Sequence, residues 1–481
     1  MSHWTTVRES ALKSKVRKQE NLRCRAPTLR LVLFGRQFQN DWDTLIDEAL
    51  ALTAQRRATF FSPHSATCRF LVLFLVCVLV IGPYCAYDSI GANQLALEKD
   101  LGISAQEFSY LYAVYSVPNI VLVFAGGLLL DKIGLMRSTL LFALLVFLGS
   151  SLVAAASQIF HSFPLMIAGR ALYGIGSESC FVAQNAIIAS WFAGRESGLA
   201  MGLGVAAGRI GTFLAFSVNS WIVNLFGFYQ AGLWFAAGLC GLSVVAAVLY
   251  GVIDFMGHAR GGLKADIGDP SLAPKEDEAG FFASIFSFGG AFWLAAIVAA
   301  TYQSSVGPFQ GFSTGLLQKQ YGMDAGSAGQ TTSIIAGVSL FLSPAFGLAA
   351  DKLGRRVVFV FLGTALLAGG FGAIAFIPLQ SPTPYYVVVG VAYALIPSAL
   401  WPALPLVVPR EKVGSAFGLA AALVNLTEMT SYQVAGYLAD HVGLSILPRF
   451  FCGLSSVALS AALLWNVVDY YTGGRANIKP Q

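Results

Sequence analysis

Twelve long apolar stretches separated by short polar turns make up most of this 481-residue chain. Each is about 20 residues or longer, which is what an α-helix needs to cross the hydrocarbon core of a bilayer. The pattern predicts membrane-spanning helices over 69–91, 107–130, 138–159, 163–192, 197–224, 228–254, 286–308, 327–350, 357–378, 383–408, 413–438 and 445–470. A single long polar interruption divides these helices into two groups of six.

The polar segments then predict five parts of the chain. A basic tail precedes the first group of helices, a linker joins the two groups, and a short tail ends the chain. The predicted boundaries are 1–68, 69–254, 255–285, 286–470 and 471–481. Because the first segment has no early apolar core, we do not expect it to be a cleaved signal peptide.

Composition agrees with a membrane protein that crosses the bilayer many times. Hydrophobic residues make up 56% of the chain and charged residues only 11%, whereas soluble domains carry about 25% charge. The net charge of +5 is concentrated in residues 1–69, which hold twelve Lys or Arg and six Asp or Glu. A basic tail beside an acidic lipid surface explains this distribution better than nucleic-acid binding does.

Charges in the loops predict the orientation in the membrane. If the first tail is cytosolic, the cytosolic loops carry eleven Lys or Arg residues and the opposite loops carry three. Cytosolic loops of membrane proteins are enriched in positive charge. Both termini and the central linker are therefore expected to be cytosolic.

Two opposite charges interrupt neighbouring apolar stretches near their middles. These are Glu178 in the fourth predicted helix and Arg209 in the fifth. A charge at the centre of a bilayer costs about 3 kcal/mol or more, so such residues usually face a cavity or line a pathway. The alternative is a structural salt bridge between the two helices.

A short charged loop occurs at the same place in each half. The first, GGLLLDKIGLMR, joins the second and third predicted helices, and the second, FGLAADKLGRR, joins the eighth and ninth. Asp131 and Asp351 are 220 residues apart, and each begins an Asp-Lys-x-Gly sequence. Matching loops in matching positions indicate two duplicated bundles.

These loops resemble the G-x-L-a-D-[RK]-x-G-[RK]-[RK] signature of the major facilitator superfamily. The resemblance implies an all-α membrane protein with twelve transmembrane helices in two pseudo-symmetric six-helix bundles. It also implies that the loop residues latch the cytosolic ends of the bundles, although Leu135 and Met136 depart from the basic pattern. The implied gating residues are Asp131, Gly134, Arg137, Asp351, Gly354, Arg355 and Arg356.

Four further runs resemble lysosomal dipeptide transporters within that superfamily: YAVYSVPNIVLVFAGGLLLDKIG, GRALYGIGSESCFVAQN, ASWFAGRESGLAMGLGVAAGRIG and LWPALPLVVPREKVGSAFGL. The resemblance implies facilitated export of dipeptides from the lysosome. It assigns the substrate ammonium to Glu178 and the carboxylate to Arg209, and it implies a glycosylated accessory membrane subunit. The further substrate-binding candidates are Tyr115, Trp401 on a helix broken by prolines, and Asn425.

Three other features bear on the mechanism. Arg170 matches an R-x-x-x-G-x-G pattern that the superfamily links to proton exchange, and Glu428 lies in the middle of the eleventh predicted helix. Both are candidates for proton coupling, and Glu428 also for a shifted substrate range. Asp41, Leu45 and Ile46 in the tail resemble an acidic dileucine sorting signal for endosomes and lysosomes.

The sequence predicts neither an enzyme nor a metal or cofactor site. It has no GxxxxGK[ST] loop for ATP, and its five histidines are scattered. Two alternatives remain beside a dipeptide uniporter. One is a carrier of organic anions or amino acids, with or without proton coupling, at the lysosomal or plasma membrane. The other is a receptor or scaffold that transports nothing.

Overall fold

The computed structural model describes residues 65–192, 196–258, 288–377, 381–409 and 412–471, together with residue 477. These residues form twelve helices of 21 to 32 residues, one shorter helix and two short 3₁₀ turns. The first group comprises α3 (Ala66–Ala92), α4 (Gln94–Leu101), α5 (Ala105–Ile133), α6 (Leu135–Gln158), α7 (Phe163–Trp191), α8 (Ser197–Phe226) and α9 (Gln230–His258). The second comprises α11 (Gly290–Tyr321), α12 (Ala325–Leu353), α13 (Arg356–Phe376), α14 (Thr383–Ala403), α15 (Val413–His441) and α16 (Leu447–Tyr471).

Each predicted span coincides with one of the twelve long helices. Among the described residues, eight helices are long and apolar enough to cross a membrane. The other four are α5, α7, α11 and α15. Polar side chains interrupt their apolar runs, and three of them carry candidate site residues, namely Tyr115, Glu178 and Glu428.

The seventh helix is longer than predicted. The apolar pattern ended at residue 308, whereas α11 continues to Tyr321. Polar residues interrupt the continuation, yet residues 309–317 are buried, and hydroxyl groups among them find partners on neighbouring helices. Ser313 lies 2.9 Å from Thr332 of α12 and 2.7 Å from Tyr386 of α14, between hydroxyl oxygens.

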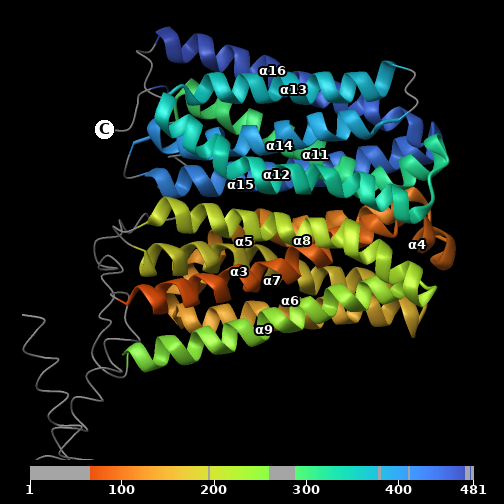
Figure 1. The fold of residues 1–481 in the computed structure, drawn as a ribbon, viewed down its shortest axis with the longest axis horizontal. Coiled ribbons are helices and arrows are strands. Elements are labelled where there is room, and N and C mark those ends of the chain that lie inside the picture. Colours follow the sequence, from red (N-terminus) through yellow and green to blue (C-terminus); the bar gives the residue numbers. More distant parts are fainter. Residues whose placement is uncertain are drawn as a thin grey trace, which may run out of the picture.

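The helices assemble into two bundles that lie side by side (Figure 1). In the first bundle, α3 packs against α8 and α9, and α6 packs against α7 and α9. In the second, α11 packs against α15 and α16, and α14 packs against α12 and α13. Between the bundles, α5 lies along α15 and α8 lies along α12. The second long helix of each half thus lies along the fifth long helix of the other half. This symmetry is expected for duplicated bundles.

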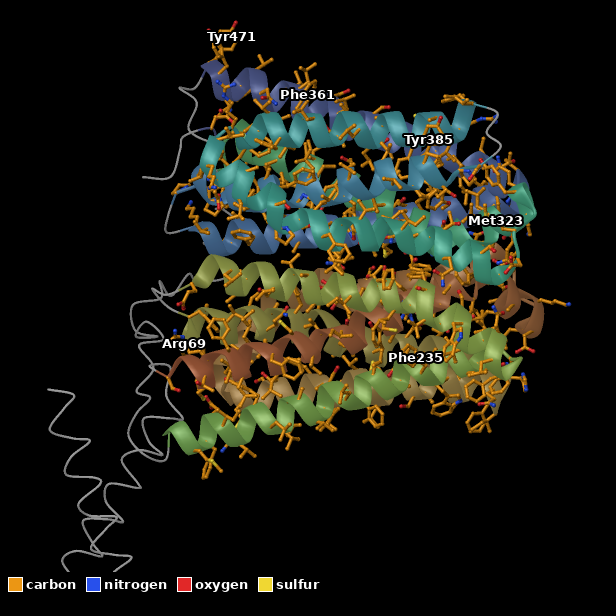
Figure 2. The ribbon with its side chains drawn as sticks, viewed as in Figure 1. Arg69, Phe235, Met323, Phe361, Tyr385 and Tyr471 are labelled. Carbon is orange, nitrogen blue, oxygen red and sulfur yellow. The ribbon has the colours of Figure 1, made fainter. Side chains whose placement is uncertain are left out.

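The assembly has two ends, which Figures 1 and 2 distinguish. Arg69, near the start of α3, lies at one end, here named the tail end. The helix α4 and Met323 lie at the other, here named the α4 end. Under the orientation predicted from loop charges, the tail end is cytosolic.

The bundles are joined at the α4 end by hydrogen bonds. The Asp440 carboxylate of α15 accepts from the backbone N–H groups of Ala105 (2.8 Å) and Gln106 (2.9 Å) in α5. These first-turn N–H groups have no partner within their own helix. Asp440 therefore caps a helix of the opposite bundle. Nearby, the Tyr112 and Tyr432 rings stack at 4.1 Å between centroids.

Two glycines allow the bundle backbones to approach each other at this end. We name Gly329 of α12 and Gly436 of α15 the glycine seam. A Cβ atom at Gly329 would lie 2.6 Å from the Phe216 carbonyl oxygen, and one at Gly436 would lie 2.9 Å from the Ala105 carbonyl oxygen. Small residues at helix interfaces permit this spacing in membrane proteins.

Candidate substrate-binding site

Glu178 lies on α7, half-buried, and is held by a tyrosine of α5. The Tyr115 hydroxyl donates to Glu178 Oε1 at 2.7 Å. The two helices come close at Gly174, where a Cβ would lie 2.7 Å from the Tyr115 carbonyl oxygen. The glycine-rich sequence around Glu178 thus brings Tyr115 within reach of the carboxylate.

Arg209 on α8 faces the second bundle. Its guanidinium carbon lies 3.8 Å from the centroid of the Tyr393 ring of α14, which is a close cation–π contact. Its Nε is buried and has no hydrogen-bond partner. Beside it, a Cβ at Gly208 would collide with the Tyr84 ring of α3. The missing side chain therefore leaves room for Tyr84, which lies in electrostatic range of both Glu178 and Arg209.

Glu178 and Arg209 do not neutralise each other in this structure. Ion pairs between described residues join Arg69 to Glu196, His161 to Asp100, and Arg356 to Asp351, and none of them includes Glu178 or Arg209. The structural salt bridge considered from the sequence is therefore absent from this part of the chain. Neither charge is therefore neutralised by the other, although both belong to the same bundle.

Arg170 supports the tyrosines around Glu178. It is 1% exposed, and its Nε donates to the Leu111 carbonyl oxygen at 2.9 Å. Its guanidinium carbon lies within 5.0 to 5.5 Å of the ring centroids of Tyr87, Tyr112, Tyr115 and Tyr173. Arg170 thus holds together aromatic rings from α3, α5 and α7.

Glu428 of α15 reaches the same tyrosines from the second bundle. It is 9% exposed and accepts a hydrogen bond of 3.3 Å from the Tyr87 hydroxyl. The Tyr87 ring lies edge-on to Tyr115, with 4.8 Å between centroids. Glu428 is therefore close to Glu178, although the two belong to different bundles.

Trp401 and Asn425 lie in different surroundings. The Trp401 ring stacks on the Phe417 ring of α15 with 5.9 Å between centroids, and Trp401 lies beside Tyr302, which neighbours Arg209 and Tyr393. Asn425 is buried, and its amide donates to the Ala421 carbonyl oxygen of its own helix at 3.0 Å. Trp401 is thus connected to the arginine end of the site.

Sequence reasoning missed three residues of this region. Asp88 of α3 is 8% exposed and lies near Thr212, Arg170 and Arg209 of the first bundle. It could have been found, because it is an acidic residue in an apolar run. Tyr302 and Tyr393 carry no such signal, since their importance comes from contacts made across the two bundles.

The predicted gating residues lie at the tail end. Gly134 and Gly354 adopt positive φ angles of 90° and 69°, and each allows a sharp turn between two helices. Asp351 accepts from Arg356 at 2.8 Å, whereas Arg355 precedes α13 and Arg137 lies in the first turn of α6. Asp131 belongs to α5 by its backbone, and its side chain lies outside the described residues. The sorting motif Asp41, Leu45 and Ile46 also lies outside them.

The geometry suits binding rather than catalysis. Within the described ranges, no three His, Cys, Asp or Glu side chains come together as metal ligands. The candidate site instead contains two carboxylates, a guanidinium whose Nε has no hydrogen-bond partner, and a surrounding layer of tyrosines. Such an arrangement presents both signs of charge in one region of the bundle junction.

Sequence comparison finds relatives that share one name in different organisms. The lysosomal dipeptide transporter MFSD1 of Homo sapiens is 31% identical over 425 residues, 86% of this chain and 89% of that protein. MFSD1 of Danio rerio is 32% identical over 428 residues, 86% of this chain and 90% of that protein.

Solved transporter structures share the fold. A D-xylose–proton symporter aligns with a TM-score of 0.63 at 15% identity, over 82% of this chain and 96% of that one. The nucleoside transporter NupG aligns with a TM-score of 0.64 at 14% identity, over 82% and 99%. The family model of the Major Facilitator Superfamily matches residues 75–427 and 292–477. The chain therefore belongs to the major facilitator superfamily.

Proposed function

We propose that this protein is a uniporter for zwitterionic dipeptides. The observation that carries the proposal is that Glu178 and Arg209 flank the bundle junction without pairing with each other. A free dipeptide has an ammonium at one end and a carboxylate at the other. A carrier that accepts many dipeptides must bind these ends and tolerate varied side chains between them. Glu178 supplies an anion for the ammonium, and Arg209 supplies a planar fork for the carboxylate.

In the described state, the two bundles meet at the α4 end. Contacts between described residues join the bundles at the α4 end, through Asp440 and the Tyr112–Tyr432 stack. In alternating access, one bundle rocks against the other around a fixed site. With the α4 end closed, substrate would leave toward the tail end. Under the predicted orientation, this corresponds to release from the lumen into the cytosol down the concentration gradient.

The proposal is tested by thermal stabilisation with a panel of ligands. A ligand that binds only the folded protein stabilises it by RT ln(1 + [L]/Kd), about 2.7 kcal/mol when its concentration is 100 times Kd. We expect free dipeptides to raise Tm, and N-acetylated or esterified dipeptides to have no effect. Equal shifts with single amino acids or with blocked peptides would instead favour the organic-anion or amino-acid carrier. Binding without any flux in proteoliposomes would favour the receptor or scaffold.

We further propose that the protein works in the endolysosomal membrane beside a glycosylated accessory subunit. The relatives named lysosomal support the location, and the basic tail carries the sequence that resembles a sorting signal. Replacing Asp41, Leu45 and Ile46 with alanine should move the protein to the cell surface, as measured by surface biotinylation. Alanine at Gln37 and Gln39 is the matched control. Unchanged lysosomal localisation of the triple variant would rule out this signal, and a normal half-life in cells without any such subunit would argue against the partner.

A further inference from the structure

Glu178 is half-buried and Glu428 is buried, and the two carboxylates come from different bundles. Each accepts a hydrogen bond from one of two neighbouring tyrosines. Tyr115 donates to Glu178 at 2.7 Å, and Tyr87 donates to Glu428 at 3.3 Å. The two rings are in edge contact at 4.8 Å. Each carboxylate is therefore one hydrogen bond away from this pair of touching rings. The two carboxylates thus face one region of the junction from opposite sides.

Glu428 has the features of a ligand-binding group and lacks those of a structural one. It is more than nine-tenths buried, and its only hydrogen bond in the described part of the chain comes from Tyr87. No Lys, Arg or His of that part forms an ion pair with it. A buried carboxylate without a cation is costly, since its lost hydration is not replaced. A cation delivered by a ligand would remove this cost.

A glycine of the second bundle leaves space for the Glu428 carboxylate. A Cβ at Gly307 of α11 would collide with Glu428 Oε1. Glycine at this position therefore provides the space in which the carboxylate lies. Thr427, the residue before Glu428, accepts a hydrogen bond of 2.9 Å from the Ser304 hydroxyl. This bond holds α15 against α11 next to the carboxylate.

We propose that Glu428 is a second ligand of the substrate ammonium and shares it with Glu178. This inference rests on the proposed function. An ammonium has three N–H donors, enough to bond two carboxylates at once. The shared ammonium connects α7 of the first bundle to α15 of the second. At the other end, Arg209 already lies against Tyr393 of the second bundle. Each end of the dipeptide is then bound where the bundles meet, so substrate binding favours their closure.

The proposal predicts a preference for a primary ammonium that depends on Glu428. A primary ammonium can bond both carboxylates, whereas an N,N-dimethylated terminus keeps its positive charge but has only one N–H donor. Losing a hydrogen bond to a charged group costs enough to weaken binding about 10- to 100-fold. We expect Ala-Ala to bind at least about tenfold more tightly than N,N-dimethyl-Ala-Ala.

The experiment compares the two peptides in wild type and Glu428→Gln by isothermal titration calorimetry. Glutamine keeps an acceptor for Tyr87 and nearly the same volume. We expect Glu428→Gln to bind Ala-Ala about 10- to 100-fold more weakly and to reduce the preference over the dimethylated peptide to about threefold or less. Glu107→Gln, an exposed change on α5, is the matched control and should behave as wild type.

The outcomes separate this inference from the proposed function. If wild type binds Ala-Ala, binding requires Arg209, and Glu428→Gln leaves both affinities unchanged, the inference is wrong while the proposed function stands. If wild type binds neither peptide, both are wrong. Melting curves without ligand report whether Glu428→Gln folds. If it does not, Glu428→Asp withdraws the carboxylate by one methylene, and undiminished preference for Ala-Ala in that variant would also overturn the inference.

Discussion

Replacing Arg209 with alanine is expected to reduce dipeptide uptake by about 100-fold or more while leaving the protein folded. Removing one partner of a buried charge pair costs about 2 to 5 kcal/mol, because the other charge remains unpaired. Here that charge is the substrate carboxylate. Arg170 cannot replace Arg209, since it is enclosed by four tyrosine rings and bonded to Leu111. The measurement is uptake of a labelled dipeptide into proteoliposomes.

Two control variants make this result specific. Arg209→Lys keeps the charge but loses the planar fork, so we expect intermediate uptake. Arg449→Ala removes an arginine from the first turn of α16, outside the site, and should not change uptake. Normal uptake by Arg209→Ala, with a normal melting temperature, would remove Arg209 from the substrate site.

Replacing Gly436 with leucine is expected to reduce transport strongly, because the side chain would keep the two bundles apart at the α4 end. A Cβ at this position already lies 2.9 Å from the Ala105 carbonyl oxygen and from Gln106 Cα. Overpacking a close contact costs about 1 to 3 kcal/mol, and a backbone atom cannot rotate away as a side chain can. The bundles must separate at this end to accommodate the leucine, which disfavours the described state. Each 1.4 kcal/mol of that cost lowers the population of the described state about tenfold, and flux should fall by up to the same factor.

Gly453→Leu is the matched control for this variant. Gly453 lies on α16 in the same bundle, and a Cβ there meets no atom within 4 Å. A leucine at Gly453 should leave flux near wild type. Equal flux in both variants would show that closure of the glycine seam is not required for the transport cycle.

The sequence predicted the features that depend on local pattern. Apolar runs located the twelve long helices, and charges within such runs located Glu178 and Arg209. The predicted end of α11 was wrong. The helix continues through buried polar residues such as Ser313, which bonds to α12 and α14, and an apolar pattern cannot detect such residues. Tyr393 was missed because its role depends on the position of α14 relative to α8. Contacts between bundles carry no periodic signal along the chain.

Asp440 makes the start of α5 a natural reporter of the conformational cycle. Its carboxylate satisfies the amides of Ala105 and Gln106 only while the bundles touch at the α4 end. When that end opens, the same amides must turn to water, and their hydrogens exchange with solvent more readily. Deuterium uptake at these two positions therefore measures how much time the transporter spends open on that side. The measurement needs no attached probe, no mutation and no knowledge of the substrate.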